Sequence, residues 1–225
     1  AVREEKALLS LGSLGGGNHF IELDQDKNGN LYAVIHTGSR HLGKEVTEYY
    51  LKQGQEIIKD KGENIPYELT YLEGALKEAY LKDLQVVQEY AELNRKIILD
   101  ELSKGMKWKI LEVHSSIHNY VDASGEKMIL RKGAVSAAEG ETVIIPVNMR
   151  DGVIIGIGRG NAEWNYSAPH GAGRIMKRED VKQRYTLDEA PFAYRELCEI
   201  KEAVKDTIAI KEILKPVYSF KAGKE

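Results

Sequence analysis

Cysteine, proline and long apolar runs are scarce in this chain, and each scarcity excludes a class of protein. The single cysteine, Cys198, rules out an internal disulfide framework and suits a reducing compartment. The five prolines are scattered and form no linker, so we draw no domain boundary. No apolar run is long enough to span a membrane, and no basic segment followed by an apolar one marks a signal peptide. We therefore expect a cytoplasmic protein with no membrane partner.

An excess of charge of one sign is also missing. Lys and Arg number 32 against 35 Asp and Glu, which gives a net charge of -3 and no overall field that draws the chain onto nucleic acid. Any RNA contact is therefore expected to be local. The 225 residues, 42% of them hydrophobic, suffice for one core, so we expect a single domain over residues 1–225. Because the first residue is Ala1 rather than Met, one expectation is that the chain begins inside a longer protein.

Two short apolar segments near the N-terminus predict a β-hairpin. Residues 19–23 and 31–36 have the composition of strands, and the polar stretch between them contains an Asn-Gly pair that favours a turn. If the turn centres near residues 27 and 28, the numbers of paired residues sum to about 55. This register places His19 directly across from His36.

The rest of the chain separates into helical and strand-rich stretches. Apolar residues at three- and four-residue spacing predict amphipathic helices, and short apolar runs between turn residues predict strands. Elements grouped in this way favour an α+β fold, with β-hairpins and mixed sheets forming a central site and long amphipathic helices packed outside. The predicted helices are residues 44–61, 68–104, 175–185 and 195–214, and the predicted strands are residues 108–113, 128–130, 142–146, 153–157 and 217–220.

Five of the six histidines stand in loops or at strand ends beside Gly, Asn or Ser. His19 follows Gly15-Gly16-Gly17-Asn18, where backbone N–H groups can approach a phosphate closely; a flexible turn before a strand is the alternative. His36 precedes a small polar loop that ends in Arg40. With His118, these imidazoles could converge on a transition metal, or each could be a hydrogen-bonded strand-end residue. His41 and His114 are interpreted as structural or supporting residues.

His170 is the candidate nucleophile. It lies in the segment Ala168-Pro169-His170-Gly171-Ala172-Gly173-Arg174, just before a predicted helix whose free N–H groups and dipole favour a negatively charged phosphorus centre. A neutral imidazole nitrogen can attack phosphorus and leave again, as nucleotidyl transfer requires. A histidine that caps a Gly-rich loop is the alternative. Taken alone, Arg131-Lys132 is interpreted as a solvated strand edge and Cys198 as a small core residue in a helix.

Together these motifs resemble the RtcB family of RNA ligases, and the resemblance runs in order through the chain. Ligases of this family join an RNA 3'-phosphate or 2',3'-cyclic phosphate to a 5'-hydroxyl with GTP and manganese. The resemblance therefore implies that activity here, in tRNA splicing or RNA repair. The matching segments are residues 11–22, His36 to Arg40, His118-Asn119-Tyr120, Arg131-Lys132-Gly133-Ala134, His170 to Arg174, and residues 188–194 with Lys221.

The resemblance also implies roles for individual residues. His170 would attack the α-phosphate of GTP, and the histidine-linked GMP would pass to the RNA 3'-phosphate before the 5'-hydroxyl displaces it. His19, His36 and His118 match ligands of Mn2+. Arg40, Lys132 and Arg174 match cations that hold RNA or nucleotide phosphates, which overturns the edge interpretation of Lys132. The positions that match guanylate-binding residues are Asn18, His19, Phe20, Ile21, Glu22, His118, Asn119, Pro146, Val147, Asn148, Met149, His170, Gly171, Ala172, Gly173, Tyr194 and Lys221.

Two departures from the family pattern keep alternatives open. Family members carry an Asp and a Cys in an N-terminal part, where they complete a two-metal site, and this chain has no counterpart of them. Val147-Asn148 stand where many members have Gly-Ser, and Val153 stands where a further serine is common, so nucleotide choice stays open. The alternatives are a metal-dependent phosphoesterase that forms no GMP adduct and a non-catalytic protein that binds RNA ends or nucleotides.

Overall fold

The computed structural model describes residues 3–176, 178–186 and 189–221. Contacts along the chain divide it into two compact units. The helical unit comprises Ala1–Phe20, Ile35–Leu111 and Lys221–Glu225, and the sheet unit comprises Ile21–Val34 and Glu112–Phe220. This division into compact units does not test the expectation of one domain over residues 1–225, which stays a prediction.

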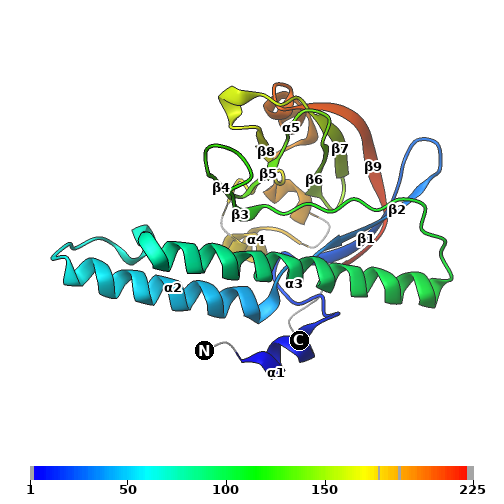
Figure 1. Ribbon diagram of the computed structural model, residues 1–225. Helices are drawn as coiled ribbons and strands as arrows, with labels where there is room; N and C mark the ends of the chain where they lie inside the picture. The colour runs from blue at the N-terminus through cyan, green and yellow to red at the C-terminus, as the bar shows by residue number, and fades with distance from the viewer. Residues whose placement is uncertain (1–2, 177, 187–188, 222–225) are drawn as a thin grey trace. The chain divides into compact units, whose positions relative to one another are not determined.

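Two long helices, α2 (Arg40–Asp60) and α3 (Gly74–Met106), lie side by side in the helical unit (Figure 1). Helix α2 buries every fourth residue from Val46 to Ile58, which gives it one apolar face. Gly54 belongs to this stripe because a Cβ there would lie 2.6 Å from the methyl group of Thr70. The other helical elements of the unit are α1 (Glu4–Ser10) and the 3-10 turn η1 (Tyr67–Leu69).

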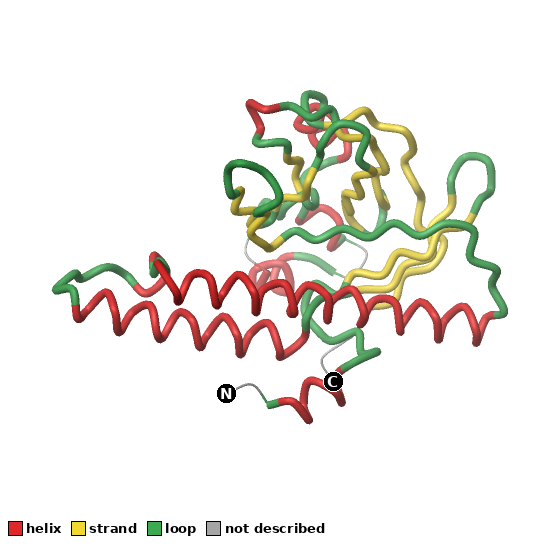
Figure 2. Tube along the Cα trace, viewed as in Figure 1, coloured by secondary structure: helices red, strands yellow, loops and turns green. Residues whose placement is uncertain are grey.

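The sheet unit is built on a five-stranded sheet with the order β2-β1-β9-β7-β6, drawn in yellow in Figure 2. β6 and β7 form an antiparallel hairpin, and β7 pairs antiparallel with β9 on its other side. Two small antiparallel pairs, β3 with β4 and β5 with β8, complete the strands. The strands are β1 (Phe20–Gln25), β2 (Leu31–His36), β3 (Asn119–Asp122), β4 (Ile129–Lys132), β5 (Ala134–Ser136), β6 (Thr142–Asn148), β7 (Gly152–Gly158), β8 (Ser167–Pro169) and β9 (Ile208–Lys221). The helical elements of this unit are η2 (Ala162–Trp164), α4 (Arg178–Arg184), η3 (Ala190–Ala193) and α5 (Leu197–Val204).

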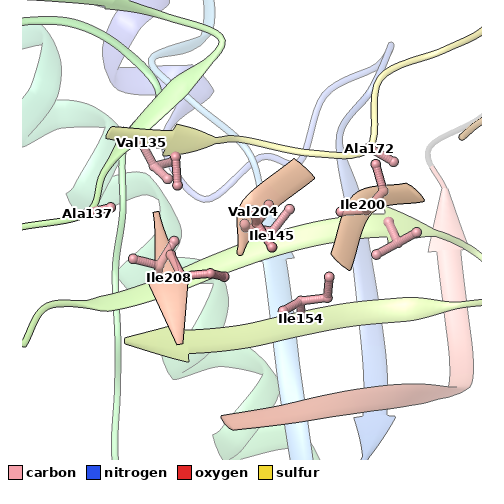
Figure 3. Close-up of a cluster of buried hydrophobic side chains, with 11 residues drawn as sticks. Val135, Ala137, Ile145, Ile154, Ala172, Ile200, Val204 and Ile208 are labelled. Carbon is pink, nitrogen blue, oxygen red and sulfur yellow. The ribbon is translucent and has the colours of Figure 1, made fainter. Parts of the chain in front are cut away.

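The core of the sheet unit lies between the β6–β7 hairpin and helix α5 (Figure 3). Alternate residues of β6, namely Val143, Ile145 and Val147, point into it, as the two-residue period of a strand requires. Ile200 and Val204 of α5 supply the other side. Because the Val147 side chain is 3% exposed and packed here, any nucleotide contact from this position has to come from its backbone.

The α+β fold class, the hairpin of residues 19–23 and 31–36, and the helices predicted over residues 44–61 and 68–104 are confirmed, although the second helix begins at Gly74. Two element predictions are wrong. Residues 108–113 form no strand, and the exposed side chains of Leu111 and Val113 show that the segment buries no face. The helix predicted over residues 195–214 ends at Val204, because the chain from Ile208 onward pairs with β7. Cys198 is exposed, so its interpretation as a core residue is also wrong.

Candidate functional site

His19 and His36 lie at neighbouring strand ends of the helical unit. Their ring centroids are 6.3 Å apart, while the Phe20 and His36 centroids are 5.2 Å apart in an edge-on arrangement. The predicted register is wrong by one position, because the Asp26 N–H donates to the Asn30 carbonyl and the turn therefore centres on residue 28. Even so, the hairpin brings the two imidazoles together.

Arg40 occupies a cradle made by the glycine-rich segment. Its Nε donates to Ser13 Oγ at 3.2 Å and its Nη1 donates to the Leu14 carbonyl at 3.2 Å. Gly15 has φ 79°, and a Cβ there would lie 1.9 Å from Arg40 Nη1. The glycine at position 15 is therefore needed for the guanidinium to lie against the backbone. This part of the glycine run holds an arginine, which neither sequence interpretation anticipated.

Asn94 is a supporting residue that the sequence analysis missed. It lies on α3, is 0% exposed, and accepts from the Ser13 N–H at 3.2 Å while its amide donates to the Ser13 and Gly38 carbonyls. It thus ties the glycine-rich segment and the loop after His36 to the same helix. A lone polar residue on the buried stripe of an otherwise amphipathic helix is the signal that could have identified it.

The environment of His19 suits a metal ligand only after a rearrangement. Burial, followed by the Arg40 charge, lowers the pKa of His19, so the ring is neutral as metal binding requires. Arg40 Nη1 lies 3.1 Å from His19 Nδ1, and because a guanidinium only donates, Nδ1 accepts and the proton is on Nε2. A metal ion bound at Nε2 would shift the ring proton to Nδ1, where the proton would face the guanidinium. A metal ion bound at Nδ1 would occupy the position that the Arg40 donor now takes. Arg40 therefore has to leave His19 before a metal binds at either nitrogen.

His118 and His170 form a second histidine pair, within the sheet unit. Their ring centroids are 4.7 Å apart. Burial, followed by the neighbouring His170, lowers the pKa of His118, so this ring too is neutral. The prediction that His19, His36 and His118 hold one ion stays a prediction. Within the described part of the chain, no three His, Cys, Asp or Glu side chains are grouped to hold an ion.

The Gly133 carbonyl sets the proton position on His170. His170 Nδ1 lies 2.6 Å from this oxygen, which can only accept, so Nδ1 carries a proton, and in the neutral ring Nε2 is the nitrogen with the lone pair. Gly133 has φ 68°, and a Cβ there would lie 3.2 Å from His170 Cε1, so a larger residue would crowd the ring. Its N–H donates to the His118 carbonyl at 2.8 Å and to Asn119 Oδ1 at 3.0 Å. The arrangement selects the tautomer of the neutral ring in which Nε2 is the nucleophilic atom.

The helix-dipole argument for His170 is not supported by the structure. Helix α4 begins at Arg178 rather than at residue 175, because Arg174 forms a β-bridge with Tyr194 and the Ile175 N–H donates to the Ala193 carbonyl. Residues 171–174 instead form a loop. The bridge to Tyr194 fixes its end, and a hydrogen bond from the Ala172 N–H to the Pro146 carbonyl fixes its middle. Arg174 lies with its guanidinium carbon 5.7 Å from the Tyr194 ring centroid.

The loop after His170 also contacts the end of β6. The Ala172 N–H donates to the Pro146 carbonyl at 3.1 Å, so the segments 146–149 and 171–173, both matched to guanylate binding, lie together. Asn148 is used in the hairpin turn, where its amide donates to Asp151 and its oxygen accepts from the Arg150 and Asp151 N–H groups. The structure leaves Met149 at the turn itself.

The remaining site residues lie as follows. His41 is exposed, and His114 Nε2 lies 3.0 Å from a carboxylate oxygen of Glu112. Lys132 is exposed at the end of β4, whereas its neighbour Arg131 is 2% exposed, so the solvated-edge interpretation is wrong for Arg131. Asn18 and Ile21 flank the Phe20 strand entry, and the Lys221 side chain lies outside the described part of the chain.

Glu22 and Asp24 stand two positions apart on β1 and are both buried, with exposures of 4% and 0%. Burial, followed by the neighbouring Glu22 carboxylate, raises the pKa of Asp24 to about 8. Asp24 is therefore protonated at neutral pH, beside a residue matched to guanylate binding.

We expect Asp24→Asn to raise the melting temperature by several degrees at pH 8 and by less at pH 5. The folded pKa of about 8 lies above the ordinary value of 3.8, so the folded state keeps a proton that the unfolded state loses. Stability therefore falls as pH rises from the ordinary value to about 8, and an amide removes this loss. Thermal melts of both chains at the two pH values measure the effect, and equal shifts at pH 5 and pH 8 would contradict the assignment.

A membrane-crossing helix is not found in the described ranges, since none of their helices is both long and apolar enough.

Comparison with known proteins gives consistent matches. A family model described as tRNA-splicing ligase RtcB matches residues 2–218. RNA-splicing ligase RtcB of Escherichia coli (strain K12) is 30% identical over 248 residues, which cover 94% of this chain and 61% of that protein. tRNA-splicing ligase RtcB of Aeropyrum pernix is 28% identical over 228 residues, covering 80% of this chain and 47% of that protein. The chain thus spans about three fifths or less of the length of these relatives. Because the family model matches nearly all of its residues, this chain belongs to the RtcB family.

Proposed function

We propose that this chain carries the GMP-accepting centre of an RNA ligase that uses GTP and Mn2+. The ligase would join RNA 3'-phosphate or 2',3'-cyclic phosphate ends to 5'-hydroxyl ends, and it would act in the cytoplasm. The observation that carries the proposal is the 2.6 Å contact between His170 Nδ1 and the Gly133 carbonyl, which makes Nε2 the nitrogen with the lone pair in the neutral ring. The names of the relatives, RNA-splicing and tRNA-splicing ligases, supply the RNA substrate class.

In the first step, His170 Nε2 attacks the α-phosphorus of GTP. A nitrogen–phosphorus bond forms, the bond from that phosphorus to the bridging oxygen breaks, and pyrophosphate leaves. The ring gains positive charge as it attacks, and the Nδ1–H bond to the Gly133 carbonyl stabilises that charge. An imidazole with the opposite tautomer would present a protonated Nε2 and could not attack.

In the later steps, an oxygen of the RNA 3'-phosphate attacks the phosphorus of the GMP attached to His170. The nitrogen–phosphorus bond breaks, and GMP is transferred to the RNA end. The 5'-hydroxyl of the second RNA end then attacks the 3'-phosphorus, and GMP leaves. Arg40, Lys132 and Arg174 would hold the phosphates during these transfers. Lys132 is exposed at the end of β4, so it is available to a phosphate.

A divalent ion would neutralise phosphate charge and polarise the reacting centre, with His19, His36 and His118 as its imidazole ligands. The lowered pKa of His19 and that of His118 support this role, because both rings are neutral near pH 7. We propose manganese rather than zinc because the family resemblance implies it, since imidazole ligands suit both ions.

A ligation assay tests the proposal. The chain is incubated with GTP, Mn2+ and two RNA pieces bearing 3'-phosphate and 5'-hydroxyl ends, and in parallel with pieces bearing 3'-hydroxyl and 5'-phosphate ends. We expect GTP-dependent joining of the first pair alone. Release of phosphate from the ends without joining would favour a phosphoesterase, and RNA retention without either reaction would favour a binding protein.

A further inference from the structure

We propose that Arg131 is a positioning residue for His170, because its buried guanidinium holds the strand ends that present the Gly133 carbonyl to His170 Nδ1. The inference rests on the proposed function only in taking His170 as the nucleophile. Sequence analysis gave Arg131 no role of its own beyond membership of a matching motif.

The Arg131 side chain is enclosed and held by several acceptors. The residue is 2% exposed. Its Nη1 donates to Asp122 Oδ2 at 2.6 Å and to the Tyr120 hydroxyl at 2.8 Å. Its Nε donates to Ser167 Oγ at 3.0 Å, and its Nη2 donates to the Tyr166 carbonyl at 3.4 Å. One planar group thereby connects β3, β4 and the start of β8.

These contacts lie just before both partners of the Gly133–His170 hydrogen bond. Gly133 comes two residues after Arg131, and His170 comes three residues after Ser167. The short β5–β8 ladder begins next to these residues, because Ala134, which pairs with Pro169, directly follows Gly133, and Pro169 directly precedes His170. β5 and β8 have three residues each, so the ladder alone fixes their register weakly. Arg131 ties the β4 and β8 segments together independently of that ladder.

The chemistry of the contacts around Arg131 indicates that its guanidinium orients its partners and adds little stability. Hydrogen bonds from Ser124, followed by the bond from Arg131, lower the pKa of Asp122 to about 2, so the carboxylate stays ionised at neutral pH. A buried ion pair is a weak source of stability, because desolvation offsets much of its attraction. A guanidinium, however, directs its N–H groups in fixed directions, and an ammonium group does not. Arg131→Lys therefore keeps the charge and loses the directed contacts to Ser167 and Tyr166.

The test is imidazole nitrogen NMR on the 225-residue chain without nucleotide. In the unaltered chain, we expect His170 Nδ1 protonated and Nε2 unprotonated. In Arg131→Lys we expect a mixture of tautomers, with the rate of GMP attachment reduced roughly tenfold to a hundredfold and KM for GTP little changed. The matched control is Arg159→Lys, since Arg159 is exposed and donates to the Ile208 carbonyl elsewhere in the sheet unit. The control should keep the tautomer and the rate.

A second variant covers the case in which Arg131→Lys does not fold. Ser167→Ala removes only the Nε contact and keeps the ion pair, so it should fold and still produce the tautomer mixture. A folded Arg131→Lys or Ser167→Ala chain with the His170 tautomer unchanged would overturn the proposal. If the unaltered chain takes up no GMP while the variants still change the tautomer, the positioning role holds and the proposed ligase function fails.

Discussion

His170→Ala is expected to take up no label from α-labelled GTP while binding Mn2+ as the unaltered chain does. The variant lacks the Nε2 lone pair that the Gly133 carbonyl keeps available, and no other atom of residue 170 can form the bond to phosphorus. His36→Ala and His118→Ala should instead lose Mn2+ binding first, with loss of GMP attachment as a consequence. A denaturing gel measures the covalent label, and a Mn2+ titration followed by electron paramagnetic resonance measures the ion.

The controls are two histidines with other surroundings. His41 is exposed on α2, and His114 is paired with Glu112, so alanine at either position should leave both readouts unchanged. Equal loss of labelling and of Mn2+ binding in the His170, His36 and His118 variants, with each variant folded, would contradict the separate roles.

Arg40→Met is expected to bind Mn2+ about tenfold to a hundredfold more tightly than the unaltered chain. In the metal-free chain Arg40 donates to His19 Nδ1 at 3.1 Å, and either metal-bound form of the ring requires that bond to break. A hydrogen bond from a charged donor contributes roughly 1.5–3 kcal/mol, which corresponds to this range of affinity. The same Mn2+ titration measures the change.

Two further variants identify the cause of the change. Arg3→Met removes a cation of the helical unit that pairs with Glu45, and it should leave Mn2+ affinity unchanged. The double variant His19→Ala/Arg40→Met should lose the gain. If His19→Ala weakens binding while Arg40→Met does not strengthen it, His19 is a ligand and the competition with Arg40 is absent.

Competition between Arg40 and an ion at His19 would link two roles that the family resemblance assigned separately. An ion that displaces the guanidinium from His19 also frees it from one hydrogen bond. We therefore expect the phosphate-binding capacity of Arg40 to increase when Mn2+ is bound, because the cation then needs another partner. Sequence analysis identified both residues but had no means of placing them 3.1 Å apart.

Local pattern predicted most elements of the fold, and it failed where distant contacts decide. The apolar stripe of α2 shows directly in the sequence. Residues 208–214 fit a helical or a strand period, and pairing with β7 selects the strand. The hairpin register moved by one because the Asp26 carboxylate accepts from the Asn28 and Asn30 N–H groups and shapes the turn, a contact that propensities do not include.

Motif reasoning proposed His170 as the nucleophile and predicted that His19 and His36 lie together, but it predicted neither the His118–His170 pair nor the residues that hold these histidines. Gly133 was found as part of a motif, while its role in fixing the His170 tautomer depends on a contact 37 residues along the chain. Arg131-Lys132 was interpreted as one exposed pair. Adjacent residues of a strand point to opposite faces, so one of two neighbouring cations in a half-buried strand has to point inward. That rule could have separated the buried Arg131 from the exposed Lys132.

The most direct test of the proposed function is the position of GMP on the chain. The chain is incubated with GTP and Mn2+, alone and with a segment that carries the family's Asp and Cys ligands, and the adduct is mapped by peptide mass spectrometry and by nitrogen–phosphorus NMR coupling. The expected result is an acid-labile phosphoramidate at Nε2 of His170. Attachment at Nδ1, attachment to another residue, or no adduct under either condition would contradict the proposal.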